Sequence, residues 1–281
     1  MSVKNKTTFS LEVFPPKKEM PLASVYPTLT ELSVLHPDFI SVTCGAQGTG
    51  SNRTAEIAAT IKEQFNLEPV AHLPGIYLTK EEVCNTLKEL KKHRIHKILA
   101  LRGDMTPEKE PAHDFAHASD LIRFIKKESP DFHIIGACYP EGHVESKRPA
   151  LDIIHLKEKV DAGASSLISQ LFFDNTLFYR FLERCEIASI HVPIAAGIMP
   201  VTNKKQIERM VSLCGATLPL HYQHLIAKYG DNPVAMRDAG IAYAIAQIID
   251  LLAHGVDGIH VYTMNNAYIA QKIADAIRTL L

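Results

Sequence analysis

EPVAHLPGIYLTKEEVCNTLKELKKHRIHKILALRG, residues 68–103, contains two short apolar segments on either side of a longer segment of mixed polarity. The two apolar segments, 68–74 and 97–103, have the length of strands. Residues 79–94 carry a helix start signal, because Thr79 is followed three positions later by Glu82, the spacing of a capping box. A strand, a helix and a second strand in this order predict a unit with two parallel strands.

The alternation of strand and helix patterns continues along the whole chain. Helical patterns recur at 117–129 and 151–163, and Gly163 supplies a stop signal for the second. The candidate strands lie at 7–14, 38–44, 68–74, 97–103, 133–139, 165–171, 193–198 and 257–263. About eight such units in 281 residues predict a single (β/α)8 TIM barrel domain over residues 1–281.

A doubly wound open sheet is the alternative fold for such an alternation. It is less favoured, because no glycine fingerprint follows the first strand and no linker or shift in composition divides the chain. The segment 199–256, between the last two candidate strands, is long enough for two or three helices. We therefore expect extra helices between strands seven and eight.

The composition is that of an ordinary soluble protein, with 46% hydrophobic and 22% charged residues. A net charge of -1 gives no broad electrostatic case for nucleic acid or an anionic membrane as a partner. No apolar run of about 18 residues and no signal peptide are present, so a cytoplasmic protein is expected. The five cysteines are scattered, and neither they nor the histidines show metal-ligand spacing, so no metal site is expected.

Polar side chains follow most of the predicted strands, at the end of a (β/α)8 barrel where active sites lie. They are Glu12, Thr43, His72, Arg102, Asp104, Tyr139, Glu141, His143, Gln170, Tyr262 and Thr263. Such a gathering indicates a polar ligand. Taken singly, Glu12 could instead pair structurally with a cation inside the barrel, and His72 is better explained as a hydrogen-bonded core histidine. Alternation along 8–13 nevertheless places Glu12 in the lumen, near the catalytic rim.

An ordered series of segments resembles the methylenetetrahydrofolate reductase family. The segments are LEVFPPK, FISVTCGAQGTGSNRT, PVAHL, ILALRGD, ACYPEGH, LKEKVDAGA, QLFFD, GIMPVTN and HVYTMN. The resemblance covers nearly the whole chain and implies a (β/α)8 barrel that binds FAD without a covalent link. It further implies reduction of 5,10-methylenetetrahydrofolate to 5-methyltetrahydrofolate with NADH or NADPH, in a ping-pong reaction through flavin N5. Because bacterial members are commonly homo-oligomers, we expect a homo-oligomer here.

The resemblance also implies roles for individual residues. Glu12 matches the family's general acid, and Asp104 matches an aspartate beside the flavin and the folate. Gln170 matches a glutamine that contacts the pterin, Met210 replaces an aromatic that stacks on the ligand in some members, and Tyr262 completes the expected substrate contacts. The expected FAD-binding residues are Thr43, His72, Arg102, Gly103, Asp104, His117, Ala118, Tyr139, His143, Asp152 and Lys159.

The chemistry of this reaction suits two carboxyl groups. Opening the substrate's five-membered ring requires a proton on an amine nitrogen and leaves an iminium carbon. A neutral Glu12 could supply that proton, and a barrel rim beside a flavin could raise its pKa. Asp104 could stabilise the cation and lower the potential of the flavin.

Some positions depart from the family pattern. Cys44, Pro74 and His117 replace the usual residues of their segments, and Asn266 replaces an arginine. His155 and Glu158 stand where an asparagine-like and a basic residue often lie near the FAD phosphates, which weakens the expected phosphate contacts. A partner-dependent or non-catalytic folate-binding or flavin-binding subunit therefore stays an alternative. A flavin-free lyase or aldolase is a third, but no Schiff-base lysine or metal cluster stands at a strand end.

Overall fold

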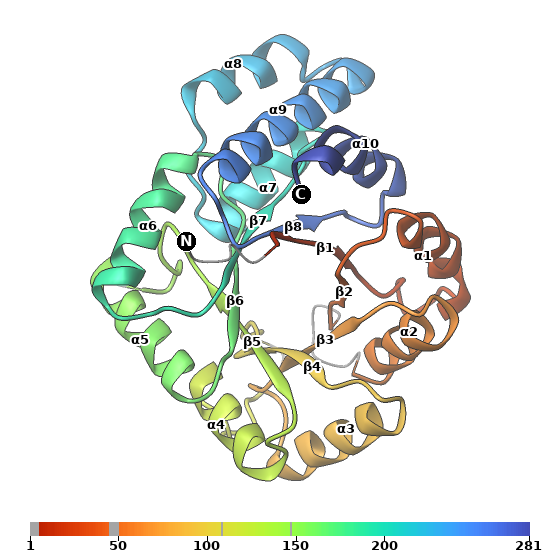
Figure 1. The fold of residues 1–281 in the computed structure, drawn as a ribbon, viewed down its shortest axis with the longest axis vertical. Helices are drawn as coiled ribbons and strands as arrows, with labels where there is room; N and C mark the ends of the chain where they lie inside the picture. The colour runs from red at the N-terminus through yellow and green to blue at the C-terminus, as the bar shows by residue number, and fades with distance from the viewer. Residues whose placement is uncertain (1–5, 45–50, 108, 147) are drawn as a thin grey trace.

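The computed structural model describes residues 6–44, 51–107, 109–146 and 148–281, so the glycine-rich segment 45–50 lies outside the described residues. Within these ranges the strands form a closed parallel barrel in chain order, which confirms the predicted (β/α)8 fold (Figure 1). The strands are β1 (Thr8–Val13), β2 (Phe39–Val42), β3 (Pro69–Pro74), β4 (Lys97–Leu101), β5 (His133–Cys138), β6 (Ser166–Ser169), β7 (Ile194–Ile198) and β8 (Gly258–Tyr262).

The helices surround the strands, as Figure 1 shows. They are α1 (Tyr26–Ser33), α2 (Ser51–Gln64), α3 (Lys80–Lys92), α4 (Ala118–Glu128), α5 (Pro149–Asp161), α6 (Asn175–Ile187), α7 (Lys204–Cys214), α8 (Leu220–Tyr229), α9 (Pro233–Ala253) and α10 (Ala267–Ile277). The capping box predicted for α3 is present, since Thr79 accepts a hydrogen bond from the Glu82 amide and Glu82 accepts one from the Thr79 amide. Gly163 follows α5 with a φ of 119°, a conformation that glycine adopts readily.

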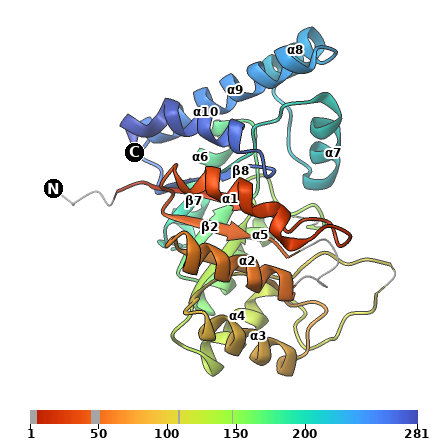
Figure 2. The ribbon, with the colours of Figure 1, turned by 90° about the vertical axis from the view of Figure 1, so that its right-hand side faces the viewer.

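The long connection between β7 and β8 contains α7, α8 and α9, which confirms the prediction of extra helices there. Helix α9 packs against α6, α10 and β7, so it fills the place of the barrel's own helix and leaves α7 and α8 as the additions. Figure 2 shows α7 and the long loop after β4 at the same end of the barrel, opposite the N-terminus. The extra helices therefore stand beside the end at which the strands terminate.

Side-chain alternation sorts each strand into an outer and a luminal face. On β1, Phe9, Leu11 and Val13 are buried in the main core between strands and helices, whereas Ser10 is fully buried on the luminal face and contacts His260, its partner on the neighbouring strand β8. A separate apolar layer fills the barrel interior, built from Val70, Leu99, Ile135, Ile168 and Ala195. Leu99 and Ile168 of this layer also line a cavity at the ends of the strands.

A second apolar core, which we call the α7–α9 core, lies apart from the main core and from the luminal layer. It contains Leu171, Phe173, Met199, Val201, Ile207, Ala216, Tyr222 and Met236, with Met210 and Tyr262 packed against it. Its members come from the segments that follow β6 and β7 and from the region of α7, α8 and α9, and Tyr262 at the end of β8 packs against them. This core fixes the extra helices to one side of the barrel mouth.

Candidate active site

A cavity of about 340 Å³ opens where the strands end. Its walls contain Glu12, Thr43, Cys44, His72, Pro74, Ile76, Tyr77, Leu99, Leu101, Arg102, Gly103, Asp104, Ala137, Tyr139, His143, Ile168, Gln170 and Tyr262. The two carboxylates and the glutamine predicted from the strand ends are therefore brought to one cavity. Glu12 lies on β1, Asp104 follows β4 and Gln170 follows β6, so the barrel itself gathers groups that are far apart in sequence.

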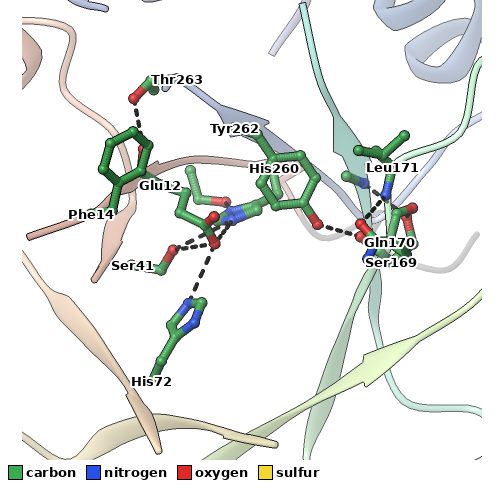
Figure 3. Close-up of polar contacts among 12 residues, drawn as sticks. Glu12, Phe14, Ser41, His72, Ser169, Gln170, Leu171, His260, Tyr262 and Thr263 are labelled. Carbon is green, nitrogen blue, oxygen red and sulfur yellow. Dashed lines mark hydrogen bonds and ion pairs between the residues drawn. The ribbon is translucent and has the colours of Figure 1, made fainter. Parts of the chain in front are cut away.

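The Glu12 carboxylate lies among two imidazoles and a hydroxyl (Figure 3). Its Oε2 is 3.3 Å from His72 Nε2, 3.5 Å from His260 Nε2 and 3.3 Å from Ser41 Oγ, which donates to it. On the far side of the ring, His260 Nδ1 is 2.8 Å from Ser10 Oγ. Although His72 Nε2 is within ion-pair distance, it makes no hydrogen bond to any described residue. The Glu12 carboxylate thus contacts the His72 and His260 rings inside the lumen and also lines the cavity.

The backbone at Glu12 is held by the segment that follows β8. Thr263 Oγ1 donates a hydrogen bond of 2.6 Å to the Glu12 carbonyl oxygen. Asn265 accepts from the Phe14 amide at 3.0 Å and donates to the Phe14 carbonyl at 2.8 Å. These bonds tie the end of β1 to β8 and fix the height of the carboxylate in the lumen.

The pKa of Glu12 is lowered to about 2 in this structure. Burial raises the pKa of the carboxyl, but the close contacts of Oε2 with His260 and His72, and the positive charge of these rings when protonated, outweigh burial. The expected raised pKa is therefore not found here. The reason is His260, a luminal neighbour that opposes the effect of burial.

We expect this lowered pKa to appear in the acid stability of the chain. Because folding lowers the pKa from 4.5 to about 2, ionised Glu12 stabilises the fold above pH 4.5, and that contribution is lost as the pH falls toward 2. The contribution is on the order of 2–3 kcal/mol. Urea unfolding from pH 7 to pH 3 should show a steeper loss of stability for the unsubstituted chain than for Glu12→Gln. Parallel curves would contradict the shift.

Tyr262 lies between the cavity and the α7–α9 core. Its hydroxyl donates a 2.6 Å hydrogen bond to the Ser169 carbonyl, at the point where Ser169 Oγ accepts from the Gly197 amide at 2.9 Å. Burial raises the pKa of the Tyr262 phenol well above its usual value, so the group stays a neutral donor. Figure 3 shows this group beside Gln170, whose Oε1 accepts from the Leu171 amide at 2.9 Å.

A second cavity, of about 520 Å³, adjoins the first between the ends of β4 and β5 and the helices α4 and α5. Its lining includes His117, Ala118, Asp152, His155, Glu158 and Lys159. Both cavities share the side chains of Leu101, Arg102, Ala137, Tyr139 and His143. The two spaces together suit an elongated ligand with two ring systems and a polar link between them.

Four charged groups of the second cavity already have partners within the protein. Lys159 donates to the Ala137 carbonyl at 2.9 Å with its ammonium 5.4 Å from the Tyr139 ring, and burial lowers its pKa. Asp152 accepts from the His143 amide at 3.0 Å. Arg102 forms a two-pronged pair with Glu145, at 2.6 Å from Nη1 and 3.0 Å from Nη2.

Every residue expected to bind a cofactor lines at least one of the two cavities. Thr43, His72, Gly103 and Asp104 line the first, His117, Ala118, Asp152 and Lys159 the second, and Arg102, Tyr139 and His143 both. Among the expected substrate contacts, Met210 packs in the α7–α9 core and does not line either cavity. Asn266 caps α10 by accepting from the Ile269 amide, which gives this departure a structural role.

The sequence reasoning missed Ser41 and His260 near Glu12, whereas alternation along the first strand placed Ser10 on the luminal face with Glu12. Ser10, Ser41 and His260 are fully buried in the lumen and form the polar surroundings of the carboxylate. The alternation that placed Glu12 in the lumen could have found the other two, since His260 precedes luminal Tyr262 by two positions on β8. Within the described ranges no three histidine, cysteine or acidic residues are grouped as a metal site, and no helix has the length and apolarity to cross a membrane.

The chain is similar to known proteins over almost its whole length. The model of the family "Methylenetetrahydrofolate reductase" matches residues 1–278. The chain is 34% identical over 275 residues to "5,10-methylenetetrahydrofolate reductase" of Escherichia coli, covering 98% of this chain and 92% of that protein. It is 33% identical to "Methylenetetrahydrofolate reductase (NADH) 1" of Arabidopsis thaliana, covering 92% of this chain and 46% of the plant protein.

A solved structure shares the fold at low sequence identity. It is a Clostridium thermocellum protein described as binding two copies of 5-methyl-5,6,7,8-tetrahydrofolic acid, with a TM-score of 0.66 and 15% identity over 99% of this chain and 96% of that one. At this identity the likeness concerns the fold alone. The family match over almost the whole chain, together with the bacterial relative of similar length, shows that the chain belongs to the methylenetetrahydrofolate reductase family.

Proposed function

We propose that the chain reduces 5,10-methylenetetrahydrofolate to 5-methyltetrahydrofolate with FAD and NADH or NADPH. The observation that carries the proposal is the placement of Glu12, Asp104 and Gln170 in one cavity that continues into a second. The names of the relatives support the substrate, and that of the plant relative supports NADH as a donor. The cytoplasmic location and the homo-oligomeric state stay predictions.

The residues present fit FAD as the ligand of the two adjoining cavities. His72 lines the first cavity with Thr43, Arg102 and Asp104, where the flavin ring would lie. The second cavity, with His117, Asp152 and Lys159 in its lining, would hold the adenosine end. When bound, FAD supplies the acceptor and donor of hydride, which no side chain can supply.

The side chains around the first cavity handle the proton and the substrate's charge. Glu12 would pass a proton to the substrate's amine nitrogen, and His260 and His72, within 3.5 Å of its Oε2, are positioned to supply that proton to the ionised carboxylate. Asp104 places a negative charge beside the carbon that becomes cationic. Gln170 offers an amide to the pterin ring, whose edge carries donors and acceptors. Because nicotinamide and folate would use the same cavity in turn, a ping-pong scheme follows.

A spectroscopic titration tests the proposal directly. Purified chain mixed with FAD should bind it, and NADH or NADPH should bleach the flavin absorbance in anaerobic stopped flow. Addition of 5,10-methylenetetrahydrofolate should then restore it, with 5-methyltetrahydrofolate as the product. Comparing the two nucleotides identifies the donor. If FAD binds but neither nucleotide reduces it, the chain is a partner-dependent subunit, a candidate favoured by the three acidic residues in the second cavity, Glu145, Asp152 and Glu158.

Asp104→Asn should slow the reoxidation of reduced flavin by folate about tenfold or more, because the iminium carbon loses a neighbouring negative charge. The same change should raise the flavin midpoint potential, since a negative charge disfavours the anionic reduced flavin. Stopped flow and a potential titration measure the two effects. Glu110→Gln, on the same loop and exposed, is the matched control. An unchanged potential with unchanged reoxidation would remove Asp104 from both roles.

A further inference from the structure

Arg102 and Glu145 form a charged pair at the junction of the two cavities. The guanidinium lines both cavities, and Glu145 lines the second. Both terminal nitrogens of Arg102 are bound to the two carboxylate oxygens, at 2.6 and 3.0 Å, and Nε donates to the Gly103 carbonyl at 3.1 Å. The whole fork of the guanidinium is therefore engaged within the protein.

The fork of an arginine binds a carboxylate or a phosphate with the same two-pronged geometry. A dinucleotide that spans both cavities must pass its linking phosphates by their shared wall, where Arg102 lies. The other cation of the second cavity, Lys159, is buried and donates to the Ala137 carbonyl. Arg102 is thus the better placed cation for the phosphates, and a carboxylate already holds it.

The other charged residues of the second cavity increase the repulsion that a phosphate would meet there. Asp152 and Glu158 line the same cavity as Glu145, so three carboxylates face two cations there, apart from any protonated histidine among His117, His143 and His155. Phosphates entering this cavity meet a surplus of negative charge as long as Glu145 stays on the fork. The Glu145 side chain is 55% exposed and the Arg102 side chain 24%, so the carboxylate can turn into solvent without being buried elsewhere.

We propose that Glu145 is a built-in competitor of the dinucleotide phosphates for the fork of Arg102, so that FAD binds by displacing it. The inference rests on the proposed function, because it takes FAD as the occupant of both cavities. It assigns Glu145 a restraining role: the residue weakens binding and slows association. Arg102 is the anion-binding residue that the displacement frees.

The test compares three ligands on flavin-free protein by isothermal titration calorimetry. FAD carries the ring and the phosphates, ADP the phosphates alone, and riboflavin the ring alone. Glu145→Gln should lower the Kd of FAD and of ADP about threefold to tenfold, because the variant loses a partly exposed ion pair with Arg102 and a carboxylate that repels phosphate. The Kd of riboflavin should stay within about twofold. Stopped-flow quenching of flavin fluorescence should show faster association of FAD.

Two further variants isolate the mechanism. Glu110→Gln removes an exposed carboxylate from the same loop as Arg102 and should change the affinity for none of the three ligands. In an Arg102→Lys background, which lacks the fork, Glu145→Gln should lose most of its gain. Equal or weaker binding of FAD and ADP by Glu145→Gln overturns the inference, as does an equal gain for riboflavin. If FAD binds to none of the proteins, the proposed function fails instead.

Discussion

Glu12→Gln is expected to lower the rate of folate reduction by about 10²- to 10⁴-fold, the usual contribution of a general acid, and to leave flavin reduction by NADH or NADPH nearly unchanged. The amide keeps the shape of the side chain but cannot donate a proton to an amine nitrogen. Hydride transfer from the nucleotide to flavin needs no such proton from Glu12. Anaerobic stopped flow separates the two half-reactions and measures each rate.

The surroundings of Glu12 explain how an ionised carboxylate can serve as an acid. The side chain is 16% exposed, toward the cavity, and its pKa of about 2 depends on His260 and His72. Ligands that cover the opening increase its burial, and burial favours the protonated form. A proton then has to move only within contacts of 3.3 to 3.5 Å. Folate turnover at the unsubstituted rate in Glu12→Gln would assign the proton to another group, and equal slowing of both half-reactions would indicate a misfolded site.

Gly197→Ala is expected to destabilise the chain by about 3 kcal/mol or more, at the upper end of overpacking effects. A Cβ at this position would lie 2.1 Å from the Ser169 carbonyl oxygen and 2.7 Å from the Tyr262 hydroxyl. The carbonyl belongs to the neighbouring strand β6, so relief requires β6 and β7 to separate. Thermal unfolding should show a fall in Tm of about 5 °C or more for a chain of this size.

Gly136→Ala on β5 is the matched control. There the closest atom to a new Cβ is Leu167 Cδ2 at 3.0 Å, the end of a side chain that can rotate. We expect a much smaller loss of stability than at Gly197. Similar losses in the two variants would show that the clash of a new Cβ with the Ser169 carbonyl is not the source of the effect.

The fold could be predicted because each βα unit carries its own signals. Segment 68–103 contains a strand, a capped helix and a strand in sequence, and the structure has β3, α3 and β4 at these places. The sequence could not show which of α7, α8 and α9 is the barrel's own helix and which are additions, because all three have helical patterns. Only packing against α6, α10 and β7 distinguishes α9 as the barrel's own helix.

The candidate site was predictable in its members but less so in its electrostatics. Strand ends gave Glu12, Asp104 and Gln170, since a parallel barrel brings all such ends together. The direction of the pKa shift of Glu12 was not predictable from the first strand alone, because it depends on His260, which lies 248 positions away in sequence and on the neighbouring strand β8 in the barrel. The place of Met210 likewise depends on how the α7–α9 core packs, which no local pattern records.

Tyr262 connects the added helices α7 and α8 with the cavity that contains Glu12. It packs against the α7–α9 core and also lines the cavity that contains Glu12. The luminal layer beneath Glu12 and the main core share no member with the α7–α9 core among the described residues. Substitutions in α7 and α8 can therefore change the affinity for a ligand through the position of the Tyr262 ring, while the luminal layer and the main core stay unchanged. Directed evolution of substrate preference should therefore begin with α7 and α8, where substitutions disturb the packing of the barrel least.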